Sequence, residues 1–190
     1  MQKSIPALGA LAFAMALAAP AVPALAQTPP ATASFKAEAV RNIQEVEKKL
    51  VALAEKFPQE KYGWRPGEGV RSTSEVFMHI AAGNYGYATF FGATRPEGTT
   101  GAALEKITDK EKVVETLKAS FAHIEAAIQN APDLDKTVKL FNHEATIREV
   151  ILQAVTHCHE HLGQLIAYAR VNAIVPPWSE HPAPPKPAKN

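Results

Sequence analysis

Apolar side chains recur every three or four residues along four long stretches of the chain, which is the period of an α-helix buried on one face. In the first stretch, Ser34 is suited to cap the helix N-terminus and Pro58 to end the helix. We therefore predict a helix over residues 35–57. Its apolar positions are Phe35, Ala39, Ile43, Val46, Leu50, Leu53 and Phe57.

The other three stretches each begin with a serine or threonine that is followed three residues later by glutamate, the pattern of an N-terminal capping box. Gly92 follows the first of them, Pro132 follows the second, and Asn172, which tolerates a left-handed conformation, ends the third. The capping pairs are Ser72 with Glu75, Thr108 with Glu111, and Thr146 with Glu149. The predicted helices cover residues 72–91, 108–131 and 146–172.

The segments between these helices predict three different connections. Tyr62 and Trp64 indicate an ordered loop that packs on the helices. Residues 93–107 are loop-like, with a short helical turn over 102–107, and residues 133–145 are irregular, with a brief extended piece favoured by β-branched and aromatic side chains. Four long amphipathic helices joined in this way predict an all-α fold, a four-helix bundle.

The first 26 residues have the composition of a secretory signal peptide. Lys3 gives a short basic start, an apolar stretch begins at Ile5, and small residues precede a cleavage site near Ala26, which disfavours a retained membrane anchor. We expect a periplasmic or secreted protein with no membrane segment after cleavage. The predicted organisation is a signal peptide over 1–26, a linker over 27–33, the bundle over 34–178, with Trp178 a candidate to fold back onto it, and a proline-rich, disordered or extended tail over 179–190.

The charge balance argues against a nucleic-acid partner. The chain has 20 Lys and Arg and 19 Asp and Glu, and removal of the signal peptide takes away Lys3 and no acidic residue. The mature protein is therefore formally neutral, whereas nucleic-acid binding proteins usually carry a basic patch. We expect a small-molecule substrate that the sequence does not identify.

Cys158 is the only cysteine, so the chain has no internal disulfide. Its place beside several histidines is compatible with a role as thiolate ligand or nucleophile. The helical phase turns it toward the apolar stripe instead, which favours a small buried hydrophobe.

Candidate chemistry centres on His157 and His161, which lie one helical turn apart on the side of the last predicted helix that faces the bundle. His159 falls on the opposite face and is expected to be exposed. His79 lies on the inward face of the second predicted helix, and three imidazoles would form a site that leaves a coordination position open. The alternative is a structural role, in which the three residues are hydrogen-bonded core histidines that bind no metal. The sequence is compatible with both interpretations.

Other titratable residues are weaker candidates. Glu160 lies close to the side of the histidine pair, and Glu75 precedes His79 by one turn, where it would orient the ring if it did not serve only in the capping box. His143 is a spare candidate in the irregular segment. His123 and His181 are expected at the surface.

The chain resembles the DinB superfamily through two groups of residues that are far apart in the sequence. The first group is Tyr62-Gly63-Trp64-Arg65-Pro66, Gly69-Val70-Arg71-Ser72 and Glu75-Val76-Phe77-Met78-His79-Ile80, and the second is His157-x-x-x-His161-Leu162-Gly163-Gln164-Leu165 with Arg170. The resemblance spans about residues 35–178.

The resemblance implies a four-helix bundle that holds a divalent metal ion, most often zinc or nickel, on three histidines. The corresponding residues here are His79, His157 and His161. Better-understood members are thiol-dependent transferases or isomerases, and many dimerise, so a homodimer is one option. The export signal departs from those members, because cytosolic thiol cofactors are not expected outside the cytoplasm.

Three hypotheses follow from these observations. The first is an exported metal-dependent hydrolase or transferase, with Glu160, Glu75 and His143 as the only candidates for a general base. The second is a non-catalytic metal-binding or stress-related bundle, and the third is a purely structural bundle. Convergence of the three histidines in space is the feature that separates the third hypothesis from the others.

Overall fold

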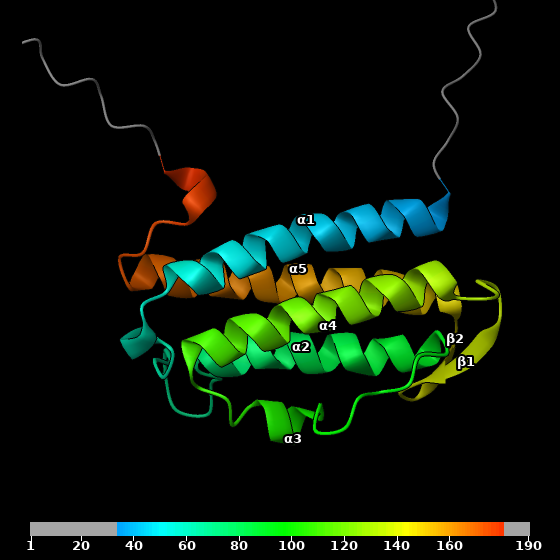
Figure 1. Cartoon of the computed structure of the whole chain (residues 1–190), viewed down its shortest axis with the longest axis horizontal. Helices are drawn as coiled ribbons and strands as arrows, with labels where there is room; N and C mark the ends of the chain where they lie inside the picture. Colours follow the sequence, from blue (N-terminus) through cyan, green and yellow to red (C-terminus); the bar gives the residue numbers. More distant parts are fainter. Residues whose placement is uncertain (1–33, 181–190) are drawn as a thin grey trace, which may run out of the picture. The chain divides into compact units, whose positions relative to one another are not determined.

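The computed structural model describes residues 34–180, and its core is a bundle of four long helices (Figure 1). These are α1 (Phe35–Lys56), α2 (Thr73–Phe90), α4 (Lys110–Asn130) and α5 (Ile147–Val171). The shorter elements are η1 (Gln59–Lys61), α3 (Gly101–Leu104), the strands β1 (Thr137–Leu140) and β2 (His143–Thr146), and η2 (Pro177–Ser179). The all-α bundle predicted from the sequence is confirmed. The predicted signal peptide, the linker and residues 181–190 of the tail lie outside the described residues.

Side-chain caps explain where the long helices begin. Ser34 accepts a hydrogen bond from the N–H of Ala37, Ser72 and Glu75 form the predicted capping box, and Thr146 caps α5. The predicted cap of α4, Thr108, was wrong by one residue. The cap is Asp109, whose carboxylate accepts from the N–H of Lys112, and a carboxylate there is also favoured by the positive end of the helix dipole.

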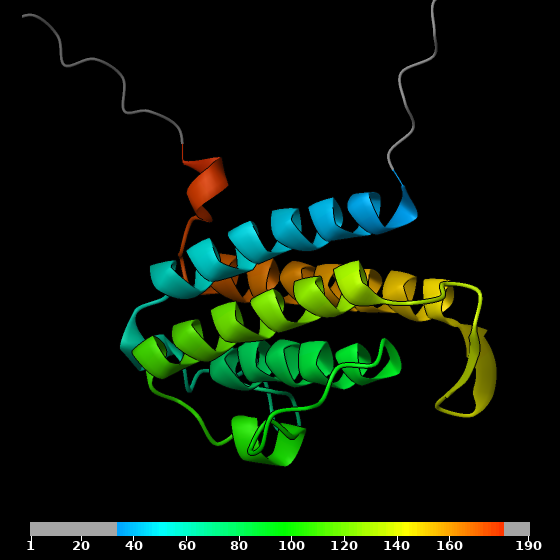
Figure 2. The same ribbon diagram turned by 45° about the vertical axis from the view of Figure 1, so that its right-hand side comes forward.

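In the bundle, α1 and α2 each pack against both α4 and α5. Figure 1 and Figure 2 show that α1 and α5 run in one direction and that α2 and α4 run in the other. The long connection after α2, which contains α3, returns along the bundle so that α4 runs parallel to α2. The antiparallel neighbours α2 and α5 therefore face each other along their length, and this contact positions the candidate site.

The loop after α1 is ordered, as predicted. Tyr62 is buried and donates its hydroxyl hydrogen to the carbonyl oxygen of Ala54, at 2.8 Å. The Trp64 ring meets the Tyr168 ring of α5 edge-on, with centroids 5.2 Å apart. The backbone N–H groups of Thr73 and Ser74 donate to carbonyls of this loop, which fixes the start of α2.

The segment before α5 forms a short antiparallel hairpin in which Leu140 pairs with His143. The two-residue turn leaves Phe141 with φ of 51°, a left-handed conformation that is costly for a residue with a side chain. Phe141 is 74% exposed, so core packing does not explain this conformation.

At the C-terminal end, Asn172 caps α5 with φ of −90°, and the left-handed residue is Ala173 instead. Pro176 is buried, η2 packs against α1, and Glu180 pairs with Lys56 at 2.6 Å. The segment that carries Trp178 therefore contacts α1, but the Trp178 side chain itself is 42% exposed. Between residues 34 and 180, no helix combines the length and the hydropathy needed to cross a membrane.

Candidate metal centre

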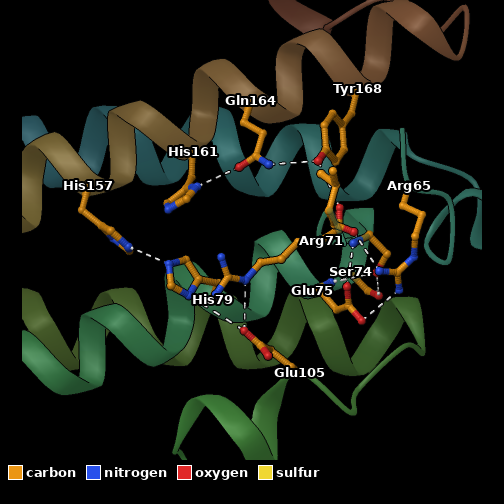
Figure 3. Close-up of polar contacts among 12 residues, drawn as sticks. Arg65, Arg71, Ser74, Glu75, His79, Glu105, His157, His161, Gln164 and Tyr168 are labelled. Carbon is orange, nitrogen blue, oxygen red and sulfur yellow. Dashed lines mark hydrogen bonds and ion pairs between the residues drawn. The ribbon is translucent and has the colours of Figure 1, made fainter. Parts of the chain in front are cut away.

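The structure brings together His79 from α2 and His157 and His161 from α5 (Figure 3). One nitrogen from each ring lies within 4.8 Å of the other two, and the Nε2 atoms of His79 and His157 are 3.2 Å apart. Nitrogens that each lie about 2.1 Å from one tetrahedral zinc ion are about 3.4 Å from one another. The His79–His157 contact is at hydrogen-bond distance between the two rings, and it is also close to the spacing of two ligands of one ion.

Burial favours the neutral form of two of these imidazoles. Desolvation, with smaller contributions from His161, His79 and Arg71, lowers the pKa of His157 to about 3. Desolvation also lowers the pKa of His79, and the nearby Arg71 guanidinium adds to the effect. A neutral imidazole offers the lone pair that metal binding requires.

Hydrogen bonds fix the orientation of His161. The Tyr168 hydroxyl lies 3.0 Å from the carbonyl oxygen of Arg71, which only accepts, so the hydroxyl donates there. It can then only accept from Gln164 Nε2, at 2.9 Å, and this orients the amide so that Gln164 Oε1 accepts from His161 Nδ1, also at 2.9 Å. His161 therefore carries its proton on Nδ1, and its Nε2 lone pair is free for the site.

Glu105, in the connection between α2 and α4, is the carboxylate that lies beside His79. Its Oε1 is 3.9 Å from His79 Nδ1 and accepts from Arg71 Nε at 3.1 Å. A carboxylate near the second nitrogen of a histidine favours metal binding by the first. Among the described residues Arg71 thus supports two sides of the site, through its carbonyl toward His161 and through its side chain toward Glu105 (Figure 3).

Glu75, by contrast, does not contact His79. It completes the capping box with Ser72 and accepts from Arg65 Nη2 at 3.0 Å. The backbone N–H of Ser72 is the main cause that lowers the pKa of Glu75, and Arg65 contributes further. The role of Glu75 as an orienting group for His79 is therefore excluded in this arrangement.

Gly83 gives the His157 ring its place against α2. A Cβ atom built on Gly83 would lie 2.6 Å from Cε1 of His157, so only glycine accommodates the ring where it stands. His157 Nδ1 is buried and has no hydrogen-bond partner among the described residues. Three converging imidazoles, two of them held neutral and one held by its Nδ1 proton, form a donor set that fits a divalent ion.

The remaining histidines lie elsewhere. His159 is exposed, as its helical phase predicted, and its Nδ1 contacts the carbonyl oxygen of Val155. His143 is exposed at the start of β2 and pairs with Glu149 at 3.3 Å. His181 lies outside the described residues.

His123 differs from its predicted surface position. Its ring packs 5.2 Å from the Tyr85 ring, and its Nε2 is covered without a hydrogen-bond partner in the described part of the chain. Helical phase alone missed this contact because Tyr85 reaches it from α2.

Neither Glu160 nor Cys158 contributes a reactive group to the histidine trio, that is, to His79, His157 and His161. Glu160 is exposed, and between residues 34 and 180 it forms no ion pair. Cys158 is fully buried, and its thiol donates to Asn84 Oδ1 at 3.4 Å. Burial raises the pKa of the Cys158 thiol to about 12, so it is a poor thiolate ligand or nucleophile, in agreement with the interpretation as a buried small residue.

A pocket of about 490 Å³ opens beside the trio. His79 and His157 line it together with Gly83, Gly86, Tyr87, Phe90, Arg95 and Phe141. No motif or periodicity in the sequence marks Arg95, Glu105 or the role of Gly83. The one available signal was the glycine four residues after His79, where helices rarely place glycine without a packing reason.

Residues 42–165, more than half of the chain, match the sequence model of the DinB superfamily, and the protein belongs to that family. Two solved structures have the same fold. A DinB-like protein from Bacillus subtilis is 19% identical with a TM-score of 0.57, covering 73% of this chain and 93% of its own. One from Bacillus cereus is 15% identical with a TM-score of 0.63, covering 75% and 93%. No curated protein matches the sequence.

Proposed function

We propose that this DinB superfamily protein holds one divalent metal ion, zinc or nickel, on His79, His157 and His161, and acts as a metal-dependent hydrolase or transferase on a small molecule. The observation that carries the proposal is the convergence of three imidazole nitrogens within 4.8 Å of one another. The three rings are partly buried, and a cation that accepts one lone pair from each offsets the partial desolvation of these nitrogens.

A bound divalent ion supplies a Lewis acid that polarises a carbonyl or lowers the pKa of a bound water or thiol. The protein's own residues prepare the site for it. Gln164 holds His161 in the tautomer with a free Nε2, and the Glu105 carboxylate stands beside His79. The adjoining pocket gives a small substrate access to His79 and His157.

Metal content of the untagged protein tests the first part of the proposal. We expect about one zinc or nickel ion per chain by elemental analysis, and a loss of this ion in His79→Ala and His161→Ala. His159→Ala is the matched control, because it removes an exposed histidine from the same helix and should leave the metal content unchanged. A stoichiometric metal that survives His161→Ala, or no stoichiometric metal in the wild type, would contradict the proposal.

Turnover tests the second part. Activity against esters, amides and thiol-transfer substrates should disappear with a chelator and return when the metal is added back. Stoichiometric metal without turnover on any of these classes would limit the function to metal binding.

We also propose that the chain is exported, on the composition of residues 1–26. Cell fractionation and N-terminal sequencing should find a mature protein that begins near Gln27 in the periplasmic or secreted fraction. A full-length chain in the cytoplasmic fraction would overturn this part. Light scattering of the mature protein decides between a monomer and a homodimer.

A further inference from the structure

The pocket beside the three histidines carries a second polar group, the guanidinium of Arg95, at some distance from the trio. This residue lies in the connection that follows α2. Its Nη1 is 3.3 Å from the carbonyl oxygen of Thr99, and its Nη2 is 3.5 Å from that of Ala82. Within residues 34–180, no carboxylate lies at ion-pair distance from Arg95. A partly buried guanidinium with five donors, two of them in long contacts, retains donors for a ligand.

The fold makes room for this guanidinium. A Cβ atom on Gly86 would lie 2.5 Å from Arg95 Nη2, so the absence of a side chain there lets the guanidinium lie against the backbone of α2. Gly83, one turn earlier, does the same for the His157 ring. Cβ positions three residues apart on a helix are about 6 Å from each other. His157 Cε1 lies 2.6 Å from the first of these positions and Arg95 Nη2 lies 2.5 Å from the second. The two atoms are therefore at most about 11 Å apart.

Aromatic side chains supply the apolar part of the pocket. Tyr87 and Phe90 come from α2, and Phe141 comes from the hairpin turn. Phe141 holds a left-handed backbone conformation although its side chain is mostly exposed. The two-residue hairpin turn sets this backbone conformation, and it leaves the exposed Phe141 side chain among the residues that line the pocket.

We infer that this pocket binds a small organic carboxylate with an aromatic or apolar body. The carboxylate pairs with Arg95, the body lies among Tyr87, Phe90 and Phe141, and the far end of the ligand reaches His79 and His157. A planar guanidinium matches a carboxylate through two parallel hydrogen bonds, and its single charge matches a single carboxylate. The orientation toward the histidines rests on the proposed metal centre, whereas the Arg95–carboxylate contact does not.

Binding of 3-phenylpropionate compared with 3-phenylpropionamide tests the inference, because the two probes differ only in the charged group. Titrations followed by NMR use protein treated with EDTA, so that neither probe binds a metal ion and the result is independent of the metal content measured separately. We expect the carboxylate to bind at least about tenfold more tightly than the amide, equivalent to about 1.4 kcal/mol. Equal affinities would overturn the inference.

Variants identify the residue that causes the preference for the carboxylate probe over the amide probe. Arg95→Gln should abolish the difference between the two probes, and Arg170→Gln, which removes an exposed arginine from the last turn of α5, should leave it unchanged. A preference that survives Arg95→Gln would refute the assignment. Gly86→Ala keeps the arginine but displaces its guanidinium, so it should reduce the preference even if Arg95→Gln does not fold.

Phe141→Gly separates the apolar contact from the charged one. Glycine accepts the positive φ at this position, so the fold should be preserved. We expect both probes to bind more weakly, with the ratio of their affinities unchanged. Unchanged affinities would remove Phe141 from the site and overturn the placement of the ligand body.

Discussion

Replacing Gln164 with leucine removes the group that fixes the orientation of His161 without touching a proposed ligand. In the wild type, Gln164 Oε1 accepts from His161 Nδ1 and Gln164 Nε2 donates to the Tyr168 hydroxyl, both at 2.9 Å. Leucine is similar in size and offers neither contact. The imidazole is then free to rotate or to change tautomer, and either change takes the Nε2 lone pair away from the site.

The expected loss follows from the role of this contact. Removal of a partner that orients a metal-bound histidine typically lowers metal affinity about 10-fold to 100-fold, which corresponds to about 1.4 to 2.7 kcal/mol. Gln164→Glu should behave in the opposite way, because a carboxylate still accepts from His161 Nδ1 and increases the basicity of the ring. We therefore expect the order of zinc affinity to be Glu at least equal to Gln, and both well above Leu.

Competition for zinc with a chromophoric chelator measures these affinities. Circular dichroism establishes that each variant is folded, and Gln129→Leu, an exposed glutamine on α4, serves as the control for the substitution itself. The reasoning is refuted if a folded Gln164→Leu protein binds zinc as tightly as the wild type. A loss of affinity of the same size in Gln164→Glu would show that the amide acts by something other than acceptance from His161.

Three further outcomes are expected. Gly83→Ala should weaken zinc binding, because its Cβ would meet the His157 ring at 2.6 Å. Gly163→Ala, with nothing within 4 Å of the new Cβ, should leave zinc binding unchanged and raise the melting temperature. Equal zinc affinities of the two variants would contradict this prediction. Burial raises the pKa of Glu47 from 4.5 to about 7, so the unfolded chain ionises this group first and the wild type loses stability as pH rises between these values. Glu47→Gln should therefore gain about 2–4 °C in melting temperature relative to the wild type at pH 8 compared with pH 4, after allowance for partial exposure, and a pH-independent difference would contradict it. Iodoacetamide should label Cys158 slowly in the folded protein and completely in guanidinium chloride, because burial raises the pKa of the thiol to about 12. Mass spectrometry measures the labelling. Rapid labelling of the folded protein would show an accessible thiolate and contradict the prediction.

The helical phase of the sequence correctly predicted which way the histidines of α5 face. It placed His157 and His161 toward the bundle and His159 toward solvent, and the structure has them there. It succeeds within one long helix because the rotation per residue is constant and the apolar stripe shows which side is buried.

Contacts between elements were not predictable in the same way. Glu75 was a reasonable partner for His79 by spacing along α2, but its carboxylate is fully engaged at the helix N-terminus. Glu105 takes the position beside His79 because the connection after α2 folds back and Arg71 holds the carboxylate there. The path of that connection follows from the packing of α3 on α2, which has no periodic signal in the sequence.

The two glycines of α2 connect the proposed metal centre and the proposed carboxylate contact at Arg95. Each glycine in a helix interior costs about 1 kcal/mol relative to alanine, so two of them within three residues weaken α2 unless close contacts require them. Such contacts exist at both positions, since a Cβ would meet the His157 ring at Gly83 and the Arg95 guanidinium at Gly86. One stretch of bare backbone thus seats a neutral imidazole and a cation within one turn of each other. Alanine at both positions would make α2 more stable but would displace both groups. A binding surface on this helix therefore requires the two glycines, at a cost in helix stability.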